Sequence, residues 1–149
     1  MRTKKLILTV VFAFAFACLS VLHAGHDKPI TYSQLPVAAQ QFIKKYFPRH
    51  KIALAKMERE VLGRSYDVIF TSGDKVEFNG SGEWTEIDCK SAPVPAGIVP
   101  APIVNYVRKN YQGAQIMEIG RKNNYYEVNL SNRLEIKFNK KFQVIEIDS

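Results

Sequence analysis

The side chains capable of covalent chemistry are few in this chain of 149 residues, and they are widely spaced. A nucleophilic site needs a thiol or hydroxyl beside a histidine, and a third group that orients the histidine. Beyond the first 24 residues the candidates are Cys89, His26 and His50. A pairing of Cys89 with His50 remains open. Because the sequence places no orienting group beside them, a small buried apolar side chain is the favoured interpretation of Cys89.

Metal-binding patterns are equally scarce. The sequence contains no C-x-x-C, H-E-x-x-H or EF-hand motif. Carboxylates are numerous, but they alternate with apolar residues, as solvated residues of a strand do. We therefore expect no catalytic residue, no metal, no cofactor, and a protein that is not an enzyme. A pocket larger than a few hundred Å³ would instead favour a carrier of small ligands.

The remaining functional signal is a set of charged and aromatic residues that strand alternation turns away from the apolar face. Aromatic side chains among polar residues make good anchors for a protein interface. We therefore expect this face to bind a partner, although an ordinary solvated sheet face has the same pattern. The candidate partner-binding residues are Trp84, Ile69, Lys75, Glu77, Glu86, Tyr125 and Lys137.

These residues lie within an internal repeat. The segment 66–89 aligns without a gap with the segment 126–149, and seven of the 24 positions are identical. Ahead of the first segment, Leu35-Pro36 recurs 64 residues later as Val99-Pro100. A period of about 60 residues is too long for a solenoid and fits a duplicated small domain.

Each half of the repeat is predicted to be a helix followed by four strands. An apolar stripe with helical spacing runs over residues 36–47 and again from Ile103 to Tyr111, and Pro48 ends the first helix. Period-two alternation and hairpin turn residues then predict strands at 51–60, 64–71, 74–79 and 83–89, and the second half keeps the same order. The predicted core comprises Phe42, Ile43, Val68, Phe78, Tyr106, Val107, Val128 and Phe138.

The Leu35-Pro36 pair, the Phe47-Pro48 pair and the strand motifs Y-D-V and V-E-F-N-G-S-G-E-W together resemble the PepSY-like family, also described as β-lactamase-inhibitor-like. The resemblance covers residues 35–149. It implies an α+β fold of tandem α-β-β-β-β units, with helices packed on one face of a curved antiparallel sheet. It also implies an exported bacterial protein that binds or inhibits another protein. Asp74 is the only acid at a hairpin tip, and no inhibitor motif surrounds it.

The N-terminus predicts export. Arg2, Lys4 and Lys5 precede a nearly continuous apolar run from Leu6 to Leu22, which is typical of a secretory signal peptide over residues 1–24. A membrane anchor and a lipoprotein site at Cys18 are the alternatives. We expect a first unit at 25–89, a Pro-rich linker at 90–98 and a second unit at 99–149.

The charge of the exported chain excludes some functions. The full chain carries +7, and the signal segment contributes three of the 21 basic residues and no acid, so the exported part carries 18 − 14 = +4. The exported chain has no basic run longer than two residues, so we expect no nucleic-acid partner. We also expect no membrane-spanning segment after removal of the signal peptide. We expect a periplasmic or secreted module that binds a protein partner in the cell envelope. Its expected role is to inhibit a cell-envelope enzyme. A structural or surface-adhesion component is the alternative.

Overall fold

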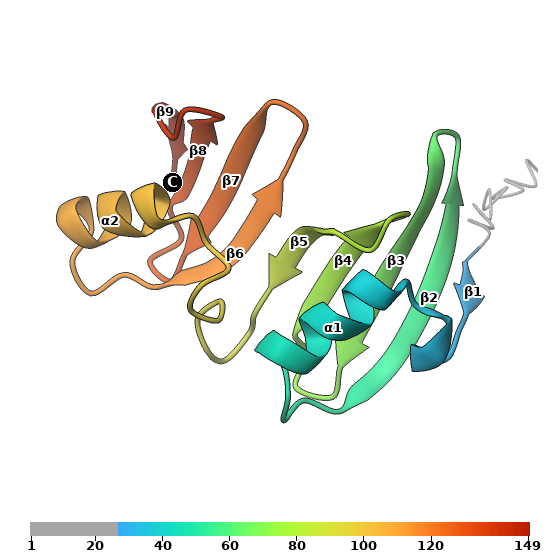
Figure 1. The fold of residues 1–149 in the computed structure, drawn as a ribbon. Helices are drawn as coiled ribbons and strands as arrows, with labels where there is room; N and C mark the ends of the chain where they lie inside the picture. Colours follow the sequence, from blue (N-terminus) through green and yellow to red (C-terminus); the bar gives the residue numbers. More distant parts are fainter. Residues whose placement is uncertain (1–26) are drawn as a thin grey trace, which may run out of the picture.

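The computed structural model describes residues 27–149, and the predicted signal peptide and His26 lie outside this range (Figure 1). Nine strands, two α-helices and one short 3-10 helix make up the described chain. In order they are β1 (Lys28–Pro29), η1 (Tyr32–Gln34), α1 (Val37–Tyr46), β2 (Ile52–Glu60), β3 (Gly63–Phe70), β4 (Lys75–Asn79), β5 (Trp84–Asp88), α2 (Ala101–Asn110), β6 (Ile116–Arg121), β7 (Tyr125–Leu130), β8 (Glu135–Asn139) and β9 (Val144–Asp148).

The predicted fold class is wrong. We expected an α+β fold of tandem units, but the chain forms one antiparallel sheet in which the nine strands follow their sequence order. The two helices have only ten residues each. The sheet is continuous because β5 pairs with β6 through Glu86↔Gly120, Ile87↔Ile119 and Asp88↔Glu118. Both helices lie on the same side of it (Figure 1).

Each α-helix begins after a proline, and an aromatic residue is its C-cap. Pro36 and Pro100 are the N-cap residues, and no side chain caps the helix at either position. At the other end, the backbone N–H groups of Phe47 and Tyr111 donate to the carbonyls of Ile43 and Val107. Without side-chain caps, the helices depend on burying their apolar stripes against the sheet.

The core is a row of aliphatic side chains that crosses the sheet from strand to strand. Its members lie directly opposite one another in register and are fully buried; they are Val68, Val76, Ile87, Ile119, Val128 and Ile136. Burial of one such side chain stabilises the fold by roughly 1.5–3 kcal/mol. We call the side of the sheet that carries this row and the helices the helix side, and the opposite side the outer face.

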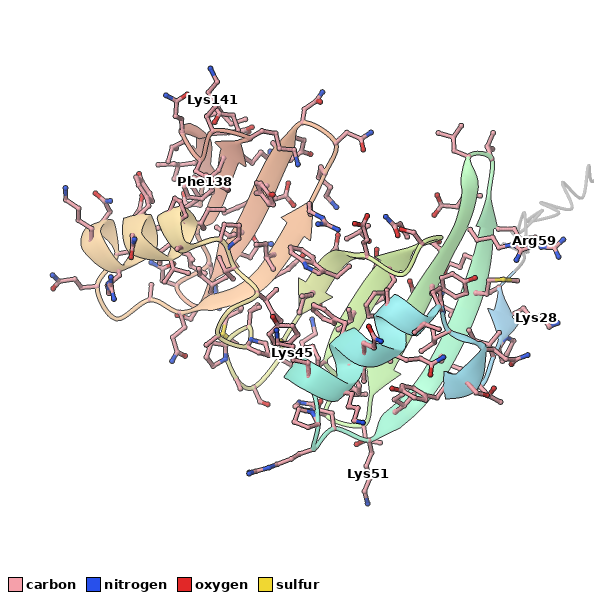
Figure 2. The ribbon with its side chains drawn as sticks, in the orientation of Figure 1. Lys28, Lys45, Lys51, Arg59, Phe138 and Lys141 are labelled. Atoms are coloured by element: carbon pink, nitrogen blue, oxygen red, sulfur yellow. The ribbon has the colours of Figure 1, made fainter. Side chains whose placement is uncertain are left out.

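Six of the eight predicted core residues are buried, and the two exceptions are the helix aromatics Phe42 and Tyr106. These two are half-buried and stand edge-on to strand residues. Phe42 lies 5.7 Å from Phe78 at an interplanar angle of 82°, and Tyr106 lies 5.4 Å from Phe138 at 85°. Phe138 projects from the side of the sheet that α2 covers (Figure 2). Edge-to-face contact of this kind adds to the energy of burial.

The β4–β5 hairpin contacts the start of α1 at Gly82. This glycine has a φ of 86°, and a Cβ atom there would lie 2.7 Å from Cβ of Pro36 and 2.9 Å from the backbone N of Ala39. The side-chain oxygen of Asn79 accepts hydrogen bonds from the backbone N–H groups of Ser81 and Glu83, which holds the turn in place. Gly82 therefore allows the helix to lie directly on the hairpin.

We expect Gly82→Ala to destabilise the protein by about 2–5 kcal/mol, because it combines left-handed backbone strain with overpacking against α1. Gly113→Ala is the matched control, since Gly113 has a φ of 81° and open space around its Cβ position. The control should cost only about 1–2 kcal/mol of strain. Urea unfolding of both variants measures the difference, and equal losses would contradict the proposed contact.

Candidate protein-binding surface

The outer face carries most of the acidic groups of the chain. Eleven of its 14 acidic residues lie there by strand register. They are Glu58, Glu60, Asp67, Glu77, Glu86, Asp88, Glu118, Glu127, Glu135, Glu146 and Asp148. Five lysines accompany them, which leaves 11 − 5 = 6 acids in excess. These lysines are Lys56, Lys75, Lys90, Lys122 and Lys137.

One charged row crosses every strand of the sheet. Starting at Pro29 of β1, each residue lies opposite the next on the neighbouring strand. The row continues as Lys56, Asp67, Glu77, Glu86, Gly120, Glu127, Lys137 and Glu146. Side chains directly opposite one another in antiparallel strands interact, so the charged residues of this row are neighbours on each side of Gly120, which has no side chain.

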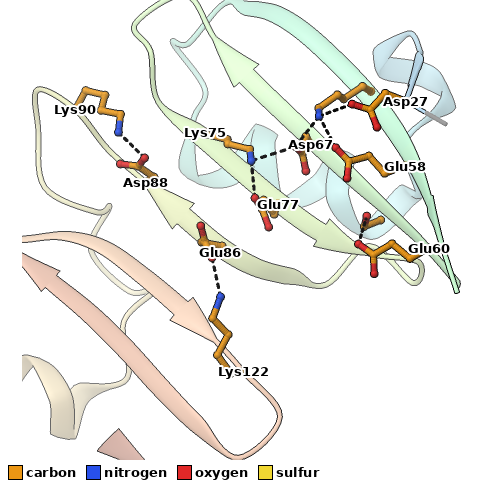
Figure 3. A network of polar contacts seen from close by, with 12 residues as sticks. Asp27, Glu58, Glu60, Asp67, Lys75, Glu77, Glu86, Asp88, Lys90 and Lys122 are labelled. Carbon is orange, nitrogen blue, oxygen red and sulfur yellow. Dashed lines mark hydrogen bonds and ion pairs between the residues drawn. The ribbon is translucent and has the colours of Figure 1, made fainter. Parts of the chain in front are cut away.

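The best-organised part of the row surrounds Asp67, whose carboxylate is buried (Figure 3). Its Oδ2 lies 3.4 Å from Nζ of Lys56 and 3.1 Å from Nζ of Lys75. Hydrogen bonds to Glu58 and then to Asp27 raise the pKa of Lys56. Burial lowers the pKa of Lys75, but hydrogen bonds to Glu77 and Asp67 outweigh it, so the pKa is raised. Both lysines therefore remain charged and compensate the buried Asp67.

The two halves of the sheet are joined on this face by Lys122. Its Nζ lies 2.8 Å from Oε2 of Glu86 (Figure 3). The Lys122 side chain reaches Glu86 by passing over Gly120. A Cβ atom added at Gly120 would lie 3.2 Å from Cε of Lys122. The absence of a side chain at Gly120 thus leaves the space in which this ion pair forms.

Strand alternation assigns Trp84 to the wrong face. Trp84 lies opposite Phe78, and the register shifts between Glu77 and Phe78. This β-bulge inserts Thr85 and turns Trp84 to the helix side, where it packs against the core. The guanidinium of Arg121 lies 4.8 Å from the Trp84 ring, and its Nη2 donates to the Trp84 carbonyl at 2.7 Å.

The other six candidate residues lie on the outer face but are not gathered at one point. Ile69 and Lys75 are directly opposite each other, as are Glu77 and Glu86. Tyr125 lies opposite Asn139, near the end of β7. Lys137 pairs with Glu146 at 3.0 Å and with Glu135 at 3.3 Å. They therefore form an extended band across the sheet.

Cys89 does not have the environment of a nucleophile. Its side chain is buried, and this burial is the main reason why the pKa of the thiol is raised to about 12. The negative charges of Asp74 and Asp88 also raise the pKa. A thiol with a raised pKa is protonated at neutral pH and is a weak nucleophile.

Asp74 and His50 have a structural role beside this thiol. The buried Asp74 carboxylate lies 3.1 Å from Nε2 of His50 and accepts the backbone N–H of Lys90 at 2.8 Å. The ring of His50 in turn stands edge-on to Phe47 and Phe70. Asp74 therefore ties the turn after α1 to the end of β5, and it is not presented to a partner.

One exposed feature was missed at the sequence level. The long β2–β3 hairpin ends in Val61 and Leu62, whose side chains are fully exposed, and Arg59 lies at its edge (Figure 2). The available signal was an apolar pair at a turn, where polar residues are expected. Fully exposed apolar residues at a projecting tip are suited to contact with another molecule.

Two further structural findings concern metal binding and the helices. Within residues 27–149, no group of three or more His, Cys, Asp or Glu side chains is arranged to hold a metal ion. In the same part of the chain, neither helix is long and apolar enough to cross a membrane.

The comparisons with known proteins identify the family. The family model described as "Putative beta-lactamase-inhibitor-like, PepSY-like" matches residues 64–146, and the chain belongs to this family. The expected family is therefore confirmed, while the tandem repeat stays a prediction. No curated protein matches the sequence.

Three solved structures from Bacteroides are similar over most of the chain. A putative periplasmic protein of the DUF2874 family from Bacteroides vulgatus has 52% identity and a TM-score of 0.82, over 85% of this chain and 99% of its own. A putative calcium-regulated periplasmic protein from Bacteroides thetaiotaomicron has 53% identity and a TM-score of 0.82, with the same coverage. Another putative periplasmic protein of unknown function from B. vulgatus has 37% identity and a TM-score of 0.78, over 83% and 99%.

The acidic groups at the β5–β6 junction make the stability depend on pH. Burial raises the pKa of Glu118 above 4.5; a hydrogen bond from Asn129 opposes this, and the charges of Asp88, Glu86 and Glu127 add to it. A carboxyl whose pKa is raised by folding binds its proton more tightly in the folded state. Its ionisation therefore destabilises the fold at neutral pH, and this penalty disappears as the pH falls below the unfolded pKa.

We expect Glu118→Gln to raise the melting temperature by a few degrees at neutral pH, because it removes this penalty and a glutamine oxygen can keep the Asn129 contact. The gain should vanish well below pH 4.5, where Glu118 is protonated in both states. Calorimetry over this range tests the expectation. Glu83→Gln, in the exposed β4–β5 turn, is the control, and an equal gain in both variants would argue against it.

Proposed function

We propose that this protein is an exported, non-enzymatic module that binds a basic protein of the cell envelope through its outer face. The observation that carries the proposal is the excess of six acids on a sheet face that no helix covers. Because the exported chain as a whole is basic, this face is the part that attracts a positively charged partner. Ile69 and Tyr125 supply apolar contact within the charged band.

The proposed location is the periplasm, after removal of a signal peptide over residues 1–24. The basic and apolar pattern of that segment supports export, and two of the similar Bacteroides proteins are described as periplasmic with more than half of their residues identical. The proposed mature protein begins at Gly25. Its two halves, 25–89 and 99–149, keep matching strand registers and a bulge at the same place in β4–β5 and β8–β9.

An inhibitory role toward an envelope enzyme is the finer part of the proposal. The family description as inhibitor-like supports it. The projecting Val61–Leu62 tip is the element best shaped to enter a recess of such an enzyme. The outer face would then supply charge attraction, and the tip would supply apolar burial.

The partner is to be captured from envelope extract with the mature protein as bait, with and without calcium, because one similar protein is described as calcium-regulated. Association of the purified pair is then measured at several salt concentrations. We expect Glu127→Lys to slow association by roughly tenfold at low salt, because Glu127 lies in the charged row and the change reverses the sign of its charge.

Glu83→Lys is the matched control, since it makes the same charge change in the β4–β5 turn, outside the row. Trp84→Ala should leave the association rate unchanged, because the ring lies on the helix side. Equal slowing by Glu127→Lys and Glu83→Lys, or a strong loss of binding in Trp84→Ala, would contradict binding through the outer face. A captured partner without an enzymatic activity would contradict inhibition and favour an adhesion role.

A further inference from the structure

A cavity of about 600 Å³ lies on the helix side, between α2 and the segment that connects β5 to α2. Its walls are mainly apolar and include Val94, Ala96, Val104 and Tyr111, while Arg108 is the single charged residue that lines it. This volume is in the range of small-molecule sites, which are mostly apolar with a few polar groups. The cavity is separate from the outer face.

The corresponding positions beside α1 carry larger side chains. Tyr32 lies four residues before the N-cap proline Pro36, and its hydroxyl donates to the carbonyl of Gln40 at 2.8 Å. The Gln40 side chain in turn donates to the carbonyl of Leu35 at 2.8 Å. An aromatic ring, itself 39% exposed, and a hydrogen-bonded amide thus lie along the flank of the first helix.

Beside α2 both of these groups are replaced by small or apolar residues. Ala96 lies four residues before the N-cap proline Pro100, where α1 has Tyr32. Val104 lies four residues after Pro100, where α1 has Gln40, and it is 39% exposed. The cavity therefore lies where the repeat gives α1 an aromatic ring and a hydrogen-bonded amide, and Ala96 and Val104 line it.

The charge at the cavity favours an anion. The Arg108 guanidinium donates to the side-chain oxygen of Asn105 at 2.8 Å, and within residues 27–149 it has no carboxylate partner. No acidic residue lines the cavity, because most of the acids lie on the outer face. An oxyacid group on a ligand is the partner that a free guanidinium recognises best.

We propose that this cavity binds a small organic anion with an aromatic body and one acidic group. The aromatic body takes the place that Tyr32 takes beside α1, against Ala96 and Val104. The acidic group lies at the rim and accepts hydrogen bonds from Arg108.

The test uses two fluorescent probes with the same aromatic body. Anilinonaphthalene sulfonate carries an acidic group, and phenylnaphthylamine lacks it. Fluorescence titration of the mature protein should show one saturable site for the sulfonate, bound about tenfold or more tightly than the neutral amine. Equal affinity for both probes, or no saturable site for the sulfonate, would overturn the proposal.

Variants separate the two parts of the site. Arg108→Gln should weaken sulfonate binding about tenfold and leave the neutral probe unchanged, whereas Lys109→Gln, the adjacent lysine outside the cavity lining, should change neither. Ala96→Tyr should abolish binding of both probes, because it restores the ring found beside α1. Circular dichroism checks that the Ala96→Tyr variant is folded. If this variant does not fold, Val104→Gln, which introduces the residue found at Gln40 beside α1, takes its place in the test. Unchanged binding in Ala96→Tyr or Val104→Gln, or equal effects of the Arg108 and Lys109 changes, would overturn the assignment.

Discussion

The pairing of β5 with β6 is the contact on which the remaining architecture depends. Only three residue pairs form this junction, and the backbone N–H groups of Cys89 and Val94 extend it by donating to the carbonyls of Met117 and Ile116 at 2.8 Å each. The junction makes one sheet out of two helix-and-strand halves. Both the core row and the charged row pass from one half to the other because of it, since strand register then continues from β1 to β9.

The individual elements were predictable from the sequence, but their assembly was not. Helical and period-two spacings predicted both helices and the strands of the first half to within a few residues. The β5–β6 junction was not predicted because it is made by backbone N–H and C=O groups. Nearly every residue type carries these groups, so they leave no pattern in the sequence. The prediction of tandem α+β units therefore failed, since no side-chain pattern distinguishes a sheet that ends from one that continues.

The candidate surface was predictable in its charge and not in its aromatic anchor. Simple alternation placed Glu77, Glu86 and Lys137 correctly, because their strands are regular at these positions. It failed at Trp84 because one bulged residue reverses the direction of the next side chain. A bulge inserts a residue without a distinctive residue type, and here that residue is Thr85. The exposed Val61–Leu62 tip and the cavity beside α2 depend on hairpin length and helix spacing, which only the structure provides.

The short first strand has a consequence for how copies of this protein behave toward one another. β1 contributes two residues and covers Met57 and Lys56 at the margin of the sheet, where the second of its residues is Pro29. Proline has no backbone N–H to donate to a neighbouring strand. The positively charged Lys28 beside it repels the Lys28 of a second copy of the protein. A molecule at high concentration therefore finds no continuous ladder at this margin on which a neighbour could extend its sheet, which opposes stacking into fibres.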